Sequence, residues 1–171
     1  MALFFQYGSN TSTTRLNSEE RLRGDARDLG LAYTEVPFEL DFDVWSTRNA
    51  CAAADLREGR GRPIWGVLYE VPDYLIRRET SGERKSLDAI EGERYECRAI
   101  RVRRPDTTPV AGDVITYTVR NPEAGLRTSI EYASHIIYGL RAHGAPDEYL
   151  AYVKERVIAN NPDLAAQVGL L

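Results

Sequence analysis

A single glutamate is the clearest candidate for acid–base chemistry in this sequence. Glu91 lies in the last turn of a short predicted helix over residues 86–91, which Ser86 caps and Gly92 ends. A carboxylate there meets the negative end of the helix dipole, at a cost of up to ~1 kcal/mol, so local stability gives no reason for it. Partial burial would raise its pKa toward that of a useful general base. The alternative is an exposed glutamate that happens to lie near a helix end.

The second candidate is the segment Tyr7-Gly8-Ser9-Asn10, which directly follows a predicted strand over residues 2–6. Glycine and asparagine tolerate positive φ, and serine and asparagine cap helices, so a plain turn explains the segment. A loop built to hold a ligand would use the same residue types. The segment alone leaves both interpretations open.

Histidine and cysteine chemistry has little support. His135 and His143 lie eight residues apart in one predicted helix, and the sequence has no Cys-x-x-Cys or His-x-x-x-His spacing, so we predict no metal site. A cysteine nucleophile would have to be Cys51 or Cys97. Thiols within strands are more often small core residues than nucleophiles.

The composition is that of an ordinary globular protein. The chain has 171 residues, 43% hydrophobic and 28% charged, with a net charge of −4. This length suits one domain with a full-sized core, so we expect a single domain over 1–171, with 159–171 as a C-terminal extension. The sequence shows no signal peptide, no apolar run near the roughly 20 residues of a membrane span and no disulfide framework. We therefore expect a reduced, cytoplasmic protein without a membrane partner.

The acidic balance also argues against nucleic acid as a partner. One basic cluster could bind phosphate or RNA, although the solvated face of a strand explains it more simply; its members are Arg98, Arg101, Arg103 and Arg104.

Residue periodicity and caps predict the elements that would position these candidates. A helix is expected from a cap at Asn17 through about Leu29, with Gly30 as its stop. Residues 36–44 alternate as a half-buried strand that Pro37 places at an edge or a start, and residues 55–62 are expected to form a loop.

The second half of the chain begins with residues 64–71, which are apolar on both faces and predict a central strand. Gly66 within it implies a bulge or a close backbone approach. Two more strands are expected over 95–103 and 113–120, and two helices over about 129–143 and 147–159. Strands outnumber crossover helices, which favours an α+β domain with a mixed or antiparallel sheet that could close as a barrel.

Three segments in order resemble the γ-glutamylcyclotransferase-like superfamily, over residues 3 to about 155. They are Tyr7-Gly8-Ser9-Asn10; Val67-Leu68-Tyr69 followed by Leu87-Asp88-Ala89-Ile90-Glu91-Gly92 and Tyr95; and Tyr132-Ala133-Ser134-His135-Ile136-Ile137 followed by Gly144-Ala145-Pro146 and Tyr149.

The resemblance implies an α+β fold, a small mixed β-barrel with surrounding helices. It also implies an enzyme that releases 5-oxoproline from a small γ-glutamyl compound, with no cofactor and no metal. The family's catalytic glutamate falls on Glu91, its substrate loop falls on residues 7–10, and Tyr95 and Tyr132 match tyrosines that line its pocket.

The sequence departs from the family where residues 49–55 (NACAAAD) are rich in alanine and where only two residues separate Gly92 from Tyr95. These departures leave the substrate preference open, including a dedicated acyl group carried as a γ-glutamyl amide. A ligand-binding or interaction module of the same fold, without turnover, is the alternative function. The oligomeric state is not readable from the sequence.

Overall fold

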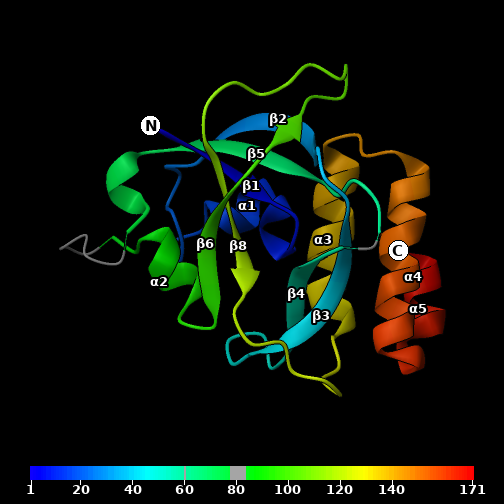
Figure 1. Ribbon diagram of the computed structural model, residues 1–171. Coiled ribbons are helices and arrows are strands. Elements are labelled where there is room, and N and C mark those ends of the chain that lie inside the picture. Colours follow the sequence, from blue (N-terminus) through cyan, green and yellow to red (C-terminus); the bar gives the residue numbers. More distant parts are fainter. Residues whose placement is uncertain (60, 78–83) are drawn as a thin grey trace.

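The computed structural model describes residues 1–59, 61–77 and 84–171 (Figure 1). Six strands form one mixed sheet in the order β6-β8-β1-β5-β2-β7. In chain order they are β1 (Ala2–Gln6), β2 (Arg27–Thr34), β5 (Trp65–Val71), β6 (Tyr95–Ile100), β7 (Val102–Arg103) and β8 (Val114–Val119). The β1–β8 pair is parallel and the other pairs are antiparallel.

A hairpin of β3 (Phe38–Ser46) and β4 (Cys51–Glu58) forms a second, two-stranded sheet. The strands curl as a half-barrel with helices packed around it, so the expected α+β class is confirmed (Figure 1). The helices are α1 (Thr13–Leu16), α2 (Leu87–Glu91), α3 (Ile130–Ala142), α4 (Asp147–Asn160) and α5 (Ala165–Leu170), with short 3-10 turns η1 (Ser9–Thr11), η2 (Asp73–Leu75) and η3 (Pro162–Leu164).

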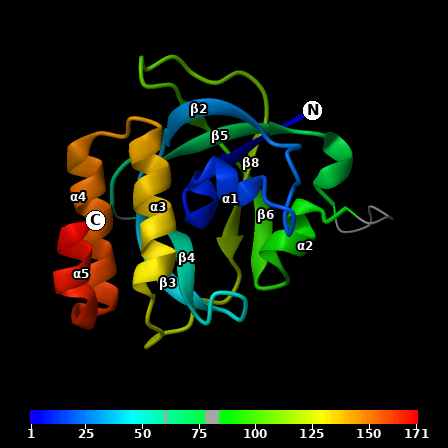
Figure 2. The ribbon, with the colours of Figure 1, turned by 180° about the vertical axis from the view of Figure 1, so that it is seen from behind.

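The helices lie at two ends of the molecule. Helices α3, α4 and α5 stand together beside the β3–β4 hairpin, and α2 lies at the opposite end beside β6 (Figure 2). The buried residues form two clusters that correspond to these ends: one links the hairpin to α3 and α4, and the other links β1 and β5 to α2 and η2. Among the described helices, none combines the length and apolarity that crossing a membrane requires.

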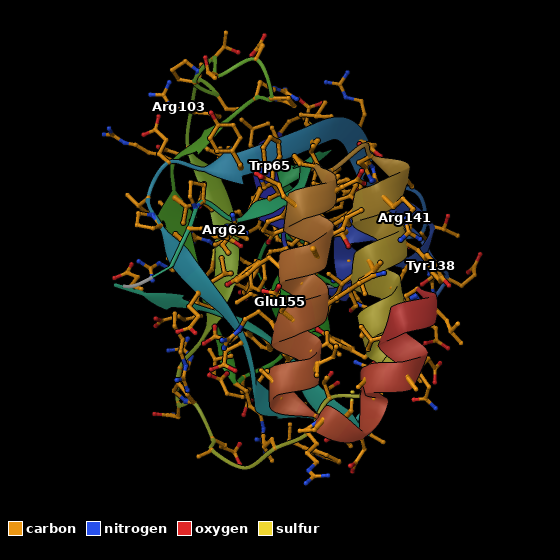
Figure 3. All side chains as sticks on the ribbon, turned by 90° about the vertical axis from the view of Figure 1, so that its right-hand side faces the viewer. Arg62, Trp65, Arg103, Tyr138, Arg141 and Glu155 are labelled. Atoms are coloured by element: carbon orange, nitrogen blue, oxygen red, sulfur yellow. The ribbon has the colours of Figure 1, made fainter. Side chains whose placement is uncertain are left out.

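The C-terminal residues fold back onto the body. Helix α5 packs against α4 and buries Val168 completely. Arg141 on α3 donates a hydrogen bond to the carbonyl oxygen of Leu171, and its guanidinium lies over the ring of the half-exposed Tyr138 on the outer side of α3 (Figure 3).

Several predicted elements are confirmed. Strand β5 lies between β1 and β2, as its apolar faces indicated. A Cβ on Gly66 would lie 2.3 Å from the carbonyl oxygen of Gln6, so this glycine marks a close approach of two backbones. Helices α3 and α4 begin and end within a residue or two of the predicted bounds.

The predicted helix from Asn17 to Leu29 is wrong. Asn17 ends the four-residue helix α1, and its side chain bonds both the N–H and the carbonyl of Ala26, at 3.0 and 2.9 Å, which closes a turn over residues 17–26. Arg27–Thr34 is strand β2, and Gly30, at φ 89°, lies at the irregularity in its pairing with β5 rather than at a helix end.

The predicted loop over 55–62 is wrong in its first half, because β4 continues to Glu58. The strand expected over 36–44 begins two residues later, after Pro37, and leaves Val36 exposed. The strand expected over 95–103 is broken into β6 and β7 at Arg101.

Candidate active site

A pocket of about 430 Å³ opens where η1, the end of α2 and the β3–β4 turn meet. Its walls come from five parts of the chain: Ser9 and Asn10; Arg21; Val44, Trp45, Ser46, Thr47, Arg48, Asn49 and Ala53; Ile90 to Tyr95; and Tyr132. A recess of about 30 Å³ adjoins it and adds Gln6, Tyr7, Gly8, Ala54 and Tyr117 to the shared lining.

Glu91 lies on the wall common to both spaces. Helix α2 holds it there because the Ser86 hydroxyl accepts the N–H of Ala89 at 3.2 Å and Gly92, at φ 87°, ends the helix. The side-chain amides of Gln6 and Asn10 donate to Oε1 of Glu91 at 3.0 and 3.2 Å. Both bonds end on the same oxygen, so they orient the carboxylate and lie apart from Oε2.

Burial raises the pKa of the Glu91 carboxyl above its ordinary value. The positive charge of Arg21, the hydrogen bonds from Asn10 and Gln6, and the charge of Arg48 act in the opposite direction. A carboxylate with a raised pKa accepts protons more readily than an exposed one, which is the property that a general base near neutral pH needs.

The turn after β1 is fixed from two sides. The hydroxyl of Tyr69 donates to the carbonyl of Asn10 at 3.1 Å, and Gly139 of α3 packs so closely that a Cβ there would lie 2.5 Å from the N of Ser12. The N–H groups of Gly8, Ser9 and Asn10 donate none of the backbone hydrogen bonds found among the described residues. Three N–H groups at the recess are therefore available to a ligand.

One residue of β4, Ala54, anchors two of the pocket tyrosines. The N–H of Ala54 donates to the hydroxyl of Tyr132 at 3.1 Å, and the hydroxyl of Tyr95 donates to the Ala54 carbonyl at 2.9 Å. The hydroxyl of Tyr7 donates to the carbonyl of Tyr117 at 2.6 Å. Burial is the main cause that raises the pKa of Tyr7, Tyr95 and Tyr132, so all three are neutral phenols at physiological pH.

Solved structures with the same arrangement of elements come from γ-glutamylcyclotransferase-like proteins. A γ-glutamyl cyclotransferase is 22% identical with a TM-score of 0.74, over 90% of this chain and 86% of that chain. The uncharacterized human protein loc79017 is 25% identical with a TM-score of 0.74 over the same shares. The chain has the γ-glutamylcyclotransferase-like fold.

YkqA from Bacillus subtilis has this fold too, at 21% identity and a TM-score of 0.70, over 93% of this chain and 55% of that longer one. No family model matches the chain, and a search of curated proteins finds no relative. The expected resemblance to the γ-glutamylcyclotransferase-like superfamily is thus confirmed through the fold.

Within this fold, the seven residues predicted for the site lie around one space. Glu91, Ser9, Asn10, Tyr95 and Tyr132 line both the pocket and the recess, and Tyr7 and Gly8 line the recess. Gly8 has φ −93°, so it does not need the positive φ that a glycine permits. A Cβ there would make only ordinary contacts, 3.4 Å from the hydroxyl of Tyr132 and 3.5 Å from Cβ of Ala54.

The other candidates from the sequence lie outside the pocket. His143 bonds Asp28 at 2.7 Å, and His135 lies 3.2 Å from a guanidinium nitrogen of Arg15. Cys51 is buried and Cys97 is exposed. Within the described ranges, no three histidine, cysteine or acidic side chains gather as metal ligands would.

The basic cluster is spread over the surface strands, and three of its members have partners of their own. Arg98 pairs with Glu58, Arg103 pairs with Glu35, and Arg104 bonds the carbonyl of Leu29. A cluster whose members are engaged in this way fits the solvated strand face better than a phosphate site.

Two functional candidates were missed from the sequence. Gln6 ends an apolar strand, and a polar residue at that point next to Tyr7 is a signal that could have been used. Arg21 is 7% exposed and lines the pocket. No sequence signal marks it, because it was assigned to the wrong element.

Proposed function

We propose that this protein is a cofactor-free γ-glutamylcyclotransferase-type enzyme that converts a γ-glutamyl amide into 5-oxoproline and a free amine. One observation carries the proposal. The oriented carboxylate of Glu91 borders the same recess as three N–H groups that donate no backbone hydrogen bond among the residues the structure describes. The fold shared with a γ-glutamyl cyclotransferase adds support.

The reaction needs a base because an α-amine is mostly protonated at neutral pH. Glu91 accepts a proton from the α-amine and the amine nitrogen then attacks the γ-carbonyl of the same glutamyl group. The new C–N bond closes a five-membered ring, and the carbonyl electron pair moves onto oxygen. The hydrogen bonds from Gln6 and Asn10 keep the carboxylate aimed during this transfer.

The oxyanion needs donors where the charge develops. The N–H groups of Gly8, Ser9 and Asn10 are the donors proposed for it, since a fixed turn provides them without reorganisation. Tyr95 and Tyr132 form walls that are themselves held by Ala54, and such walls keep the flexible glutamyl chain curled toward its own carbonyl.

The intermediate then collapses. The oxyanion re-forms the carbonyl, the bond between the γ-carbon and the leaving nitrogen breaks, and Glu91 returns its proton to that nitrogen. Glu91, ionised again, takes the second hydrogen from the ring nitrogen and passes it to the released amine, which leaves as an ammonium ion. The ring nitrogen keeps one hydrogen, so atoms and charges balance. No outside nucleophile takes part.

The test is 5-oxoproline release from γ-glutamyl amino acids, γ-glutamylamines and glutathione by the wild-type protein and by Glu91→Gln. Loss of a general acid–base group predicts a fall in kcat of roughly 10²–10⁴-fold. The matched control is Glu96→Gln, an exposed glutamate on β6 whose nearest charged partner, Arg120, lies 3.8 Å away. Full activity in Glu91→Gln would show that another group is the base. Binding without product for every substrate would favour the non-catalytic module instead.

A further inference from the structure

Arg21 is a buried cation that has no partner in residues 1–59, 61–77 and 84–171. Only 7% of it is exposed, yet within the described part of the chain its guanidinium forms no ion pair and no hydrogen bond. Burial lowers the pKa of Arg21 to about 10, which still leaves it charged at neutral pH. Its guanidinium nitrogens are not among the fully buried polar atoms without a partner, so they reach the water of the pocket that Arg21 lines. An anionic ligand group that displaced this water would have to compensate the charge, which suits a carboxylate.

The neighbours of Arg21 on its own turn do not neutralise it. The carboxylate of Glu19 is 95% exposed and lies 3.8 Å from Arg23 rather than from Arg21. Glu20 is exposed as well. Other charges act on Arg21: Arg15 and Arg48 disfavour its charged form, and Glu91 favours it.

Arg21 and Glu91 line the same pocket without forming an ion pair. The space between a base and an unpaired guanidinium suits a ligand that carries an amine and a carboxylate. A carboxylate bound near Glu91 without a counter-charge would face repulsion in a partly desolvated site. A guanidinium offsets that repulsion by donating two parallel, charge-assisted hydrogen bonds to the carboxylate.

We propose that Arg21 is the anion-binding residue of this pocket and that it holds a carboxylate of the ligand. This inference rests on the proposed function for the identity of that ligand. The carboxylate has two possible sources in a γ-glutamyl amide: the α-carboxylate of the glutamyl group, or a carboxylate on the leaving amine. Either source makes Arg21 a specificity-determining residue.

The first arm of the test needs no turnover. Calorimetry compares 5-oxoproline with 2-pyrrolidinone, the same ring without its carboxylate, on the wild-type protein and on Arg21→Gln and Arg21→Lys. The wild-type protein is expected to prefer 5-oxoproline. If Arg21 holds the α-carboxylate, Arg21→Gln loses roughly tenfold to a hundredfold of that affinity, since a hydrogen bond to a charged group is removed. Arg21→Lys is expected to recover part of it. Binding of 2-pyrrolidinone is expected to stay unchanged.

The second arm identifies the source of the carboxylate. In the Glu91→Gln background, which removes turnover, calorimetry compares γ-glutamyl-alanine with γ-glutamyl-ethylamine. An equal loss for both ligands on adding Arg21→Gln assigns the α-carboxylate. A loss confined to γ-glutamyl-alanine assigns the carboxylate of the leaving amine, in which case the 5-oxoproline preference of the first arm persists in Arg21→Gln.

The control is Arg23→Gln, which removes the same charge from the same turn at a residue outside the pocket lining. Wild-type affinities in Arg21→Gln for all four ligands, or no binding of any of them to the wild-type protein, would overturn the proposal. Failure of 5-oxoproline release would count against the proposed function alone, because the first arm measures binding without turnover.

Discussion

Glu91 and Arg21 face one pocket, but the protein holds them in opposite ways. Glu91 receives two amide hydrogen bonds, from β1 and from η1. Arg21 is buried beside it and, among the residues that the structure describes, has no hydrogen-bonding or ion-pairing partner. The Glu91 carboxylate is oriented before a ligand binds. The Arg21 guanidinium would gain its hydrogen-bond partner only from a bound ligand.

The difference indicates a division of roles within the site. A group that moves protons benefits from a fixed direction, since a small displacement of a catalytic group lowers the rate strongly. A group that binds charge gains most when its hydrogen-bonding capacity is unused in the free protein. Variants that disturb the hydrogen bonds to Glu91 should therefore lower stability or shift the pKa of Glu91. Variants that remove Arg21 should keep the protein stable but raise the pKa of Glu91, because the charge of Arg21 holds that pKa down.

Gly66→Ala should have the largest effect on the free energy of unfolding, because it disturbs β1, the strand that carries Gln6. A Cβ there would lie 2.3 Å from the carbonyl oxygen of Gln6 and 2.6 Å from the ring of Phe5, so β1 must move. We expect a loss of about 3 kcal/mol, or roughly 6–12 °C in Tm for a chain of this size. Differential scanning calorimetry measures it. Gly169→Ala is the control, because nothing lies within 4 Å of its Cβ position, and an equal loss there would contradict the explanation.

Asp55→Asn tests a buried acid whose carboxylate accepts a backbone hydrogen bond. Asp55 is 2% exposed and accepts the N–H of Val119 at 2.8 Å. Burial raises the pKa of Asp55 from 3.8 to about 6. The folded protein therefore keeps a proton that the unfolded chain releases, and the contribution of Asp55 to stability falls as the pH rises from about 4 to about 6.

Asparagine does not ionise, so Asp55→Asn should gain stability relative to the wild type, on the order of 2 kcal/mol, at pH 8 and little at pH 4. Urea denaturation at the two pH values measures the gain. Asp163→Asn, an exposed aspartate paired with Arg127, should change by less than about 0.5 kcal/mol at both. A larger gain at pH 4 than at pH 8 would reverse the sign and refute the raised pKa.

Gln6→Ala removes one of the two donors to Glu91. That hydrogen bond favours the ionised carboxylate, so its loss should raise the pKa of Glu91 further and move the acidic limb of the pH–rate profile to higher pH. We expect kcat at neutral pH to fall by about tenfold, close to 1.4 kcal/mol. The rate of 5-oxoproline release against pH measures both effects. Gln167→Ala, an exposed residue on α5, should leave the profile in place.

Local sequence signals explain why the position of Glu91 was predictable. Ser86 and Gly92 mark both ends of α2 within the sequence, so the position of Glu91 at a helix end followed directly. The apolar faces of β5 and the cap at Ser129 identify their elements in the same way.

The turn that carries Arg21 was not predictable from such signals. Asn17 followed by Glu20 has the spacing of a capping box, but the Asn17 amide bonds Ala26, nine residues away, and Gly24 adopts φ 89°. Strand β4 was missed for a related reason. Its alanines have little intrinsic preference for a strand, and pairing with β3 decides their conformation.

Arg21→Met should have the smallest effect on the free energy of unfolding, and its direction decides how Arg21 is used. Replacing an unpaired buried cation with an apolar side chain of similar length removes a desolvation penalty, so we expect a gain of about 1 kcal/mol, or roughly 2–4 °C in Tm. Thermal denaturation measures it, and Arg23→Met, on the same turn but exposed, should show no such gain. A fall of several degrees would mean that Arg21 holds the turn together. A rise together with weaker binding of 5-oxoproline would mean that the protein gives up stability at Arg21 in order to bind an anion, which is the role that its burial without a partner indicates.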